Sequence, residues 1–361
     1  MSLVSVAVGL LAVAFLLLLL QRQQRTNRVP MTLVSDAFGN EALVLRGEVA
    51  GRGSALFMLD TAYAGPPVLS TSYLARRGWL ASHQSVQREY EETMARMAVD
   101  PTDDERFRGV AELLSRGVCR SYTSGCTMRL MGIGVTQETQ ADMLLCPSLR
   151  FEGERQTGSA EAAGDVLVTN PLRGNVHILT MDYLLHRSPC VLLPRKGCIQ
   201  FGLPPLTQAT DKPSFEFLPA SMLGGAFQVD MTVGGARLRV VVDTGAAAGL
   251  SIGKDVLPRL RRCQLTTTHA YQTGVNGERV CSDVLRVDVD VGGLRVEDVE
   301  LFVNSSNVEG ADGYAGMGLL RAFDLWLAPG ELGVRPNGLP PRHSSSATAG
   351  ACGGVPPACG V

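Results

Sequence analysis

Two short segments place an aspartate and a threonine at the end of an apolar run. In "LFMLDTAYAGPPVL", residues 56–69, the triplet begins at Asp60, and in "VVVDTGAAAGLSIG", residues 240–253, it begins at Asp243. Two carboxyl groups held together can share one proton, so that one takes a proton from water while the other gives one to a carbonyl oxygen. The duplicated triplet therefore predicts a paired acid–base site that needs neither a metal nor a covalent nucleophile.

The sequence around each triplet is also duplicated. Residues 41–62, "EALVLRGEVAGRGSALFMLDTA", and residues 225–245, "GAFQVDMTVGGARLRVVVDTG", both read as strand, glycine turn, strand and triplet. Their alternation and β-branched content predict strands. Further along, "HILTMDYLL" at 177–185 echoes "GYAGMGLL" at 313–320, which aligns the two methionines. The chain is thus expected to fold as two related halves, each contributing one aspartate.

Each half has a glycine-rich turn between its triplet and its later apolar element. The turns lie in "MGIGVTQ", residues 131–137, and in "TGVNGER", residues 273–279, and both predict β-hairpins. Their glycines are Gly132 and Gly134 in the first half and Gly274 and Gly277 in the second. The first half carries extra residues before its hairpin, near 87–120, that are charged and favour helix. We interpret them as a surface insertion, with a dedicated substrate gate as the alternative.

Composition divides the chain into five expected segments. They are a membrane anchor with its basic flank at 1–28, a first lobe at 29–203, a Pro-rich linker at 204–213, a second lobe at 214–338 and a disordered, low-complexity tail at 339–361.

Residues 3–20, "LVSVAVGLLAVAFLLLLL", are uncharged and approach the length of a membrane-spanning helix. A cleaved signal peptide is the competing interpretation, but neither a basic segment before the run nor a small-x-small cleavage site after it is present. Arg22, Arg25 and Arg28 come after the run, which favours a single-pass anchor with the folded part in the cytoplasm.

In their order, these motifs resemble pepsin-like and retropepsin-like aspartic proteases with both lobes in one chain, over about residues 31–335. The resemblance implies an all-β, bilobal fold, with the insertion as a small helical addition to the first lobe. It also implies a polypeptide substrate, a monomer and no cofactor. Asp60 and Asp243 would be the catalytic pair, and the first lobe's hairpin would be the flap that closes over the substrate.

The residues after each aspartate would shape the loops. Thr61 and Thr244 carry hydroxyl groups that can hydrogen-bond across the lobe interface. Gly245 would let the backbone turn sharply, so that the two aspartates meet, and Ala62 stands at the equivalent position of the first loop.

The sequence departs from the family pattern at several places. Ala62 replaces a glycine, and Thr180 stands where Gly316 stands in the second half. Tyr63 and Ala246 occupy positions where pepsin-like members often have Ser or Thr. An aliphatic hydroxyl there would stabilise an ionised aspartate, so its absence predicts a pH optimum closer to neutral than that of pepsin.

Other functions have less support in the sequence. A catalytically inactive peptide-binding or structural membrane protein is compatible with the altered first half. "GLSIG" at 249–253 matches a serine-hydrolase elbow around Ser251, but the preceding strand ends too early and Pro258 interrupts the segment after the serine, where a helix is needed. A metal site has little support, because the five histidines form no i, i+4 pair and no Cys-x-x-Cys occurs. The net charge of −2 gives no reason to expect nucleic acid as a partner.

The nine cysteines leave the redox state open. Cys190 and Cys198 bracket a predicted hairpin and could face each other across it, and the pairs Cys119 with Cys126 and Cys263 with Cys281 are similarly local. Free buried thiols are the alternative.

Overall fold

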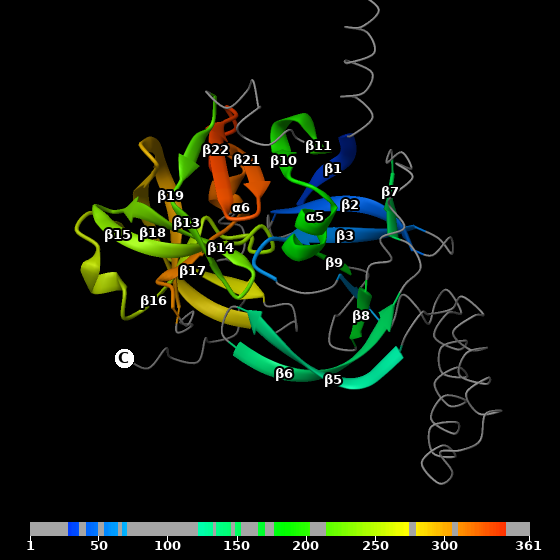
Figure 1. Cartoon of the computed structure of the whole chain (residues 1–361). Helices are drawn as coiled ribbons and strands as arrows, with labels where there is room; N and C mark the ends of the chain where they lie inside the picture. The colour runs from blue at the N-terminus through cyan, green and yellow to red at the C-terminus, as the bar shows by residue number, and fades with distance from the viewer. Residues whose placement is uncertain are drawn as a thin grey trace, which may run out of the picture.

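The computed structural model describes residues 28–35, 41–49, 54–63, 67–70, 122–132, 135–145, 149–152, 165–169, 177–202, 214–273, 279–304 and 310–343. Within these residues the protein is almost wholly β-structure, with two short α-helices and two single 3₁₀ turns (Figure 1). The prediction of a β-fold is confirmed.

The elements come in two series along the chain. Those of the first half are β1 (Arg28–Ser35), β2 (Glu41–Val49), β3 (Ser54–Asp60), β4 (Val68–Ser70), β5 (Tyr122–Gly132), β6 (Val135–Leu145), β7 (Leu149–Phe151), β8 (Asp165–Thr169), β9 (His177–Thr180), α5 (Met181–Arg187), β10 (Cys190–Leu193), η1 (Pro194–Lys196) and β11 (Cys198–Phe201). Those of the second half are β12 (Glu216–Leu218), β13 (Ala220–Leu223), β14 (Ala226–Val233), β15 (Ala236–Val242), β16 (Leu250–Gly253), η3 (Leu257–Arg259), β17 (Gln264–Thr273), β18 (Arg279–Val291), β19 (Leu294–Asn304), β20 (Gly313–Ala315), α6 (Met317–Leu320), β21 (Phe323–Ala328) and β22 (Glu331–Pro336).

Backbone pairing joins the two halves. One sheet runs β12-β22-β21-β10-β11-β1-β2-β3-β9-β4-β8-β6-β5, with β7 beside β2, and the other runs β13-β14-β15-β20-β16-β19-β18-β17. Strands β12, β22 and β21 come from the second half but extend the first sheet, because β21 pairs with β10 at Val191↔Trp326 and its neighbours. The lobes therefore share one hydrogen-bonded sheet, whose strands stand side by side between them in Figure 1.

The internal repeat is visible in the strand register. β3 pairs in parallel with β9, and β15 pairs in parallel with β20. Leu59 lies opposite Leu179, and Val242 lies opposite Ala315, so each aspartate comes after an equivalent pair. The helices α5 and α6 then begin at the two aligned methionines, both fully buried. The alignment inferred from the sequence is confirmed.

The position directly before helices α5 and α6 holds different residues in the two halves. Thr180 is buried and its hydroxyl accepts a hydrogen bond from the Tyr183 N–H at 3.3 Å, which caps α5. At the equivalent Gly316, a Cβ would lie 2.4 Å from the Ala248 carbonyl oxygen and 2.6 Å from that of Ala246. Glycine is therefore required in the second lobe, whereas a threonine fits in the first.

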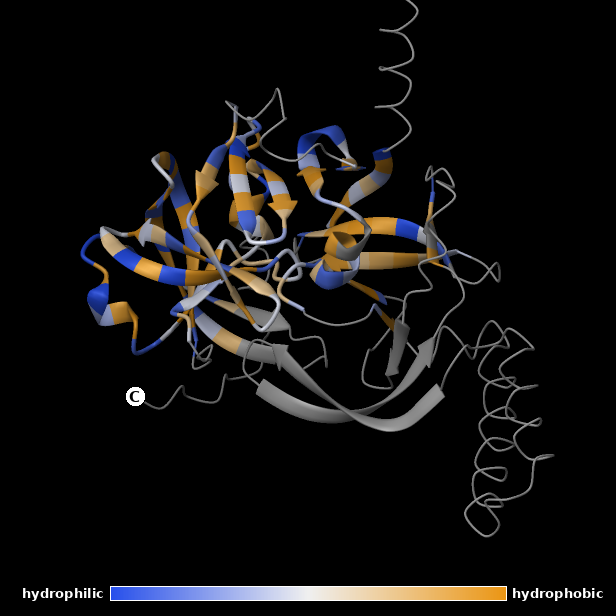
Figure 2. Ribbon diagram, viewed as in Figure 1, coloured by the Kyte–Doolittle hydropathy of each residue, from blue (hydrophilic) through white to orange (hydrophobic). Residues whose placement is uncertain are grey.

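Hydrophobic residues alternate with polar ones along the strands of the second lobe (Figure 2). In β15 the sequence Arg237-Leu238-Arg239-Val240 alternates exposed and buried side chains, after which Val241 and Val242 are both buried. β15 is thus half-buried at its start and fully buried just before Asp243. This burial fixes the point at which the Asp243 side chain emerges from the core.

Both predicted hairpins are present. β5 and β6 meet at Gly132↔Val135, and β17 and β18 meet at Thr273↔Arg279. The other candidate flap glycines, Gly134, Gly274 and Gly277, lie outside the described residues, as do the expected insertion at 87–120 and the linker at 204–213. In the part of the chain that is described, no helix is long and apolar enough to cross a membrane, and the expected anchor at 3–20 lies outside that part.

The expected facing of Cys190 and Cys198 is wrong. The hairpin between β10 and β11 closes with Leu193 opposite Cys198, which leaves Cys190 at its far end, opposite Phe201. Both are free thiols, and burial raises the pKa of Cys190 to about 12. Cys263, of the third candidate pair, is a free thiol as well.

The start of the expected disordered tail packs instead against the body of the protein. The Arg342 N–H donates to the Gly318 carbonyl at 2.8 Å, and the Arg342 guanidinium contacts Glu41 of the first lobe. Glu41 is nearly fully buried and also accepts from Arg321 Nη1 at 2.7 Å on each carboxylate oxygen. One first-lobe carboxylate thus holds two arginines, one from the second lobe and one from the segment that follows it, next to the shared sheet.

Glu41→Gln should destabilise the protein, because it leaves two arginines near the lobe interface without their counter-charge. We expect a loss of about 3 kcal/mol in the free energy of unfolding, measured by urea denaturation. The exposed Glu331→Gln serves as the control and should change it by less than about 0.5 kcal/mol. Equal effects of the two substitutions would contradict a stabilising role for this contact.

Candidate active site

The two triplets meet at the interface of the lobes and are tied together through their threonines. The Thr61 hydroxyl donates to the Val242 carbonyl at 2.8 Å and accepts from the Thr244 N–H at 3.0 Å. The Thr244 hydroxyl donates to the Leu59 carbonyl at 2.8 Å and accepts from the Thr61 N–H at 3.2 Å. Both threonines are fully buried, and the hydrogen bonds expected across the interface are present.

Each carboxylate is oriented by its own loop. Asp60 Oδ1 accepts from the N–H groups of Ala62 and Tyr63 at 2.9 and 3.0 Å. Asp243 Oδ1 repeats this arrangement with the N–H groups two and three residues along the chain, at 2.8 and 3.1 Å. The backbone therefore fixes one oxygen of each carboxyl and leaves the other free to face the partner carboxyl or a ligand.

The two carboxyls are in direct contact, since they hydrogen-bond each other. A methyl group at Gly245 would lie 2.8 Å from the carboxyl carbon of Asp60 and 3.1 Å from Asp243 Oδ1, so glycine is needed for this approach. The first triplet has Ala62 instead, and its methyl group packs against the cluster that contains Val241. The alanine is thus accommodated in the second lobe's apolar surface.

Burial is the largest cause that raises the pKa of both carboxyls, although part of each residue remains accessible to solvent. The pKa of Asp243 is raised well above its ordinary value, and the negative charge of Asp60 adds to the effect. Their mutual hydrogen bond lowers the pKa of Asp60 and raises that of Asp243. The pair therefore favours one shared proton.

Two tyrosines flank the pair, one from each lobe. Tyr63 comes directly after the first triplet, and Tyr314 lies opposite Val241 in the β15–β20 register, on the same face as Asp243. Burial, followed by the negative charge of the aspartates, raises the pKa of each phenol to about 12. Both remain neutral hydrogen-bond donors at the pair. The sequence reasoning missed Tyr314, although its place two residues before Gly316 in the repeated element could have indicated it.

The serine-hydrolase interpretation is contradicted by the structure. Ser251 lies inside strand β16 instead of at a strand-to-helix turn, and it is buried. Its hydroxyl accepts a hydrogen bond from Asn304 Nδ2 at 2.7 Å, so it has neither the exposure nor the base that a nucleophile needs. Among the described residues, no three His, Cys, Asp or Glu side chains gather in a way that could hold a metal ion.

A two-lobed β-fold that brings one Asp-Thr loop from each lobe to a shared carboxyl pair defines an aspartic-protease-like protein. Residues 229–320 match the family described as Aspartyl protease. This segment contains the second triplet and the later apolar element, and the resemblance inferred from the sequence is confirmed.

Solved structures of low identity also match. A retropepsin-like aspartic protease from Rickettsia conorii is 18% identical, covering 33% of this chain and 86% of that chain, with a TM-score of 0.25. The EIAV protease in complex with the inhibitor HBY-793 is 18% identical over 27% and 86%, with a TM-score of 0.22. An aspartic proteinase from Irpex lacteus is 13% identical over 86% and 96%, with a TM-score of 0.40. No curated protein sequence matches the chain.

Thr244→Val should destabilise the lobe interface, because it removes the buried hydrogen bonds that the Thr244 hydroxyl makes to the Leu59 carbonyl and the Thr61 N–H. We expect the free energy of unfolding to fall by about 3 kcal/mol. Thr244→Ser keeps the hydroxyl and should cost only about 1 kcal/mol for the lost methyl group. Urea denaturation distinguishes the two, and equal losses would show that packing, not hydrogen bonding, ties the loops together. The double variant with Thr61→Val should lose less than the sum, since the two hydroxyls form one network.

Proposed function

We propose that the chain is a membrane-anchored aspartic endopeptidase, held by residues 3–20, in which Asp60 and Asp243 activate a water molecule. The observation that carries the proposal is the contact between the two carboxyls, each with one oxygen fixed by its own loop. Their raised pKa values support a singly protonated pair near the acidic to neutral range. Such a pair supplies both a base and an acid at one place.

A pair that shares one proton can divide the work of base and acid between its two carboxyls. Ionised Asp60 would take a proton from the water molecule while the water oxygen attacks the peptide carbonyl carbon. Asp243 would donate its proton to the carbonyl oxygen, giving a neutral tetrahedral diol. Asp60 then gives its proton to the amide nitrogen while Asp243 takes a proton from a diol hydroxyl, so the C–N bond breaks and the pair returns to its starting protonation. The neutral Tyr63 and Tyr314 would limit the access of water and line the space beside the reacting carbonyl.

The decisive experiment compares the purified full chain with Asp60→Asn and Asp243→Asn on a diverse peptide mixture between pH 3 and 8. Each substitution removes one half of the acid–base pair while keeping its shape, so we expect cleavage to fall at least about a thousandfold. Mass spectrometry of the products measures it. A statine-type inhibitor should block the wild type.

Ser251→Ala is the matched control and should keep full activity. If the folded wild type cleaves no peptide and binds no statine-type inhibitor, the chain is instead an inactive, peptide-binding relative. Equal activity of the Asp60→Asn and wild-type proteins would exclude catalysis by the shared carboxyl pair.

The pH dependence should reflect the direction of both pKa shifts. kcat/KM rises with pH as Asp60 ionises and falls as Asp243 loses the shared proton. Because burial raises both pKa values above the ordinary range of aspartate, both limbs should move to higher pH. We expect a maximum above about pH 4.5. A maximum below about pH 3.5, in the range of pepsin's pair, would contradict the raised pKa values.

A further inference from the structure

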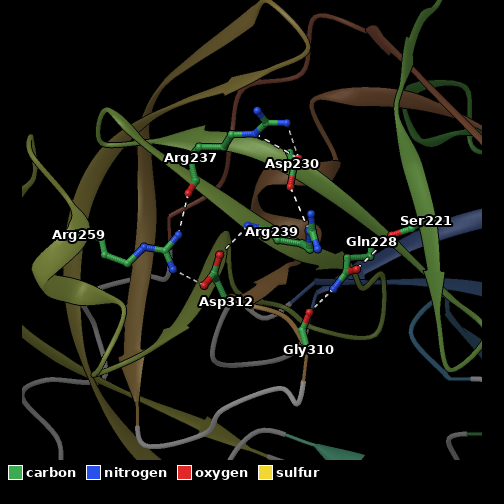
Figure 3. A network of polar contacts seen from close by, with 8 residues as sticks. All are labelled: Ser221, Gln228, Asp230, Arg237, Arg239, Arg259, Gly310 and Asp312. Atoms are coloured by element: carbon green, nitrogen blue, oxygen red, sulfur yellow. Dashed lines mark hydrogen bonds and ion pairs between the residues drawn. The ribbon is translucent and has the colours of Figure 1, made fainter.

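A recess of about 680 Å³ opens in the second lobe and is lined by alternating charges. Arg237 and Arg239 lie on β15, Asp230 on β14, and Arg259 and Asp312 on neighbouring segments (Figure 3). None of these residues takes part in the carboxyl pair.

The recess lies on the same face of the sheet as the candidate catalytic residue. Side chains alternate along a strand, so Arg239, Val241 and Asp243 all project from one face at the end of β15. At about 3.3 Å per residue, Arg239 lies roughly 13 Å from Asp243 along the strand. Asp312, which accepts from the Arg239 N–H at 2.8 Å, stands two residues before Tyr314, which flanks the carboxyl pair. A peptide bound at the carboxyl pair could therefore reach the recess within a few residues.

The charges in the recess leave one guanidinium available. Asp230 Oδ2 accepts from Arg237 Nε and Nη2 at 3.2 and 2.6 Å, and Asp230 Oδ1 accepts from Arg239 Nε at 3.3 Å. Arg259 pairs with Asp312. Three arginines thus face two aspartates, and in the part of the chain that the structure describes the terminal nitrogens of Arg239 have no hydrogen-bond partner. Arginine pairing lowers the pKa of Asp230, which keeps it ionised and holds Arg239 in place.

The wall of the recess is preformed. Gln228 is nearly buried, its Nε2 donates to the Gly310 carbonyl at 2.6 Å, and its Oε1 accepts from Ser221 Oγ at 3.1 Å (Figure 3). Gly310 has φ +82°, a conformation that favours glycine. These contacts fix the segment leading to Asp312, so little ordering would be needed when a ligand binds.

We propose that this recess binds a carboxylate of the polypeptide substrate, an acidic side chain about three to five residues from the scissile bond. This inference rests on the proposed peptidase function. The planar fork of Arg239 matches a carboxylate in bidentate geometry. The single excess positive charge fits one negative charge, whereas a phosphate dianion would meet repulsion from Asp230 and Asp312. The recess would thus select acidic substrates without taking part in the chemistry.

The test uses peptides that differ only in Glu or Gln at each of the positions three to five residues on either side of the cleaved bond. We expect the wild type to prefer Glu at one of them by about three- to tenfold in kcat/KM, through KM with little change in kcat. Arg239→Gln should abolish the preference, Arg239→Lys should keep part of it, and about 0.5 M salt should weaken it. Asp230 remains paired with Arg237 in these variants.

Arg295→Gln is the matched control, because Arg295 is similarly exposed and also pairs with an aspartate, Asp288. It should leave the Glu preference unchanged. No preference at any position, or its persistence in Arg239→Gln, would overturn the proposal.

Fluorescence anisotropy of the same peptide pairs on the Asp243→Asn protein separates this proposal from the peptidase function. Tighter binding of the Glu peptide, lost with Arg239→Gln, supports the recess even if no peptide is cleaved. Equal binding of Glu and Gln peptides overturns it even if the protein is an active peptidase.

Discussion

The contact between two carboxyl groups from different lobes is the constraint on which the rest of the structure depends. Like charges so close together cannot both remain ionised, so the pair is stable only if one proton is shared. The two loops lower the cost by giving each inner oxygen two backbone N–H donors. The two carboxyls hydrogen-bond each other, which holds the shared proton between them. The arrangement of the lobes and the protonation of the pair thus depend on the same contact.

Such a contact requires the two lobes to keep a fixed position relative to each other. Three sets of contacts between the lobes provide this. At the centre, the buried hydroxyls of Thr61 and Thr244 each bond to the opposite strand and loop. Behind them, the pairing of β10 with β21 makes the lobes parts of a single sheet. A third link is Glu41, which holds Arg321 of the second lobe and Arg342 of the segment that follows it. Each feature links residues that are far apart in the sequence.

The halves share one plan but differ where their packing differs. Gly245 and Gly316 are required because a methyl group would strike a carboxyl or a carbonyl oxygen. In the first lobe, Ala62 packs on an apolar cluster and Thr180 caps a helix, so side chains are accommodated at both equivalent positions. The departures from the family pattern therefore leave the carboxyl pair assembled. The second lobe, in which glycine is required at both positions, also carries the arginine recess on the face that bears Asp243.

The sequence by itself determined the β-fold, the alignment of the two duplicated halves and the identity of the paired aspartates, because these depend on local alternation and on short motifs repeated along the chain. Only the tertiary structure decided which residues gather around them. Tyr314, Glu41 with its two arginines and the recess around Arg239 depend on contacts between distant strands, for which no local pattern exists. The wrong facing of Cys190 and Cys198 has the same origin, since hairpin register is set by how the turn closes, and the residues alone did not specify it.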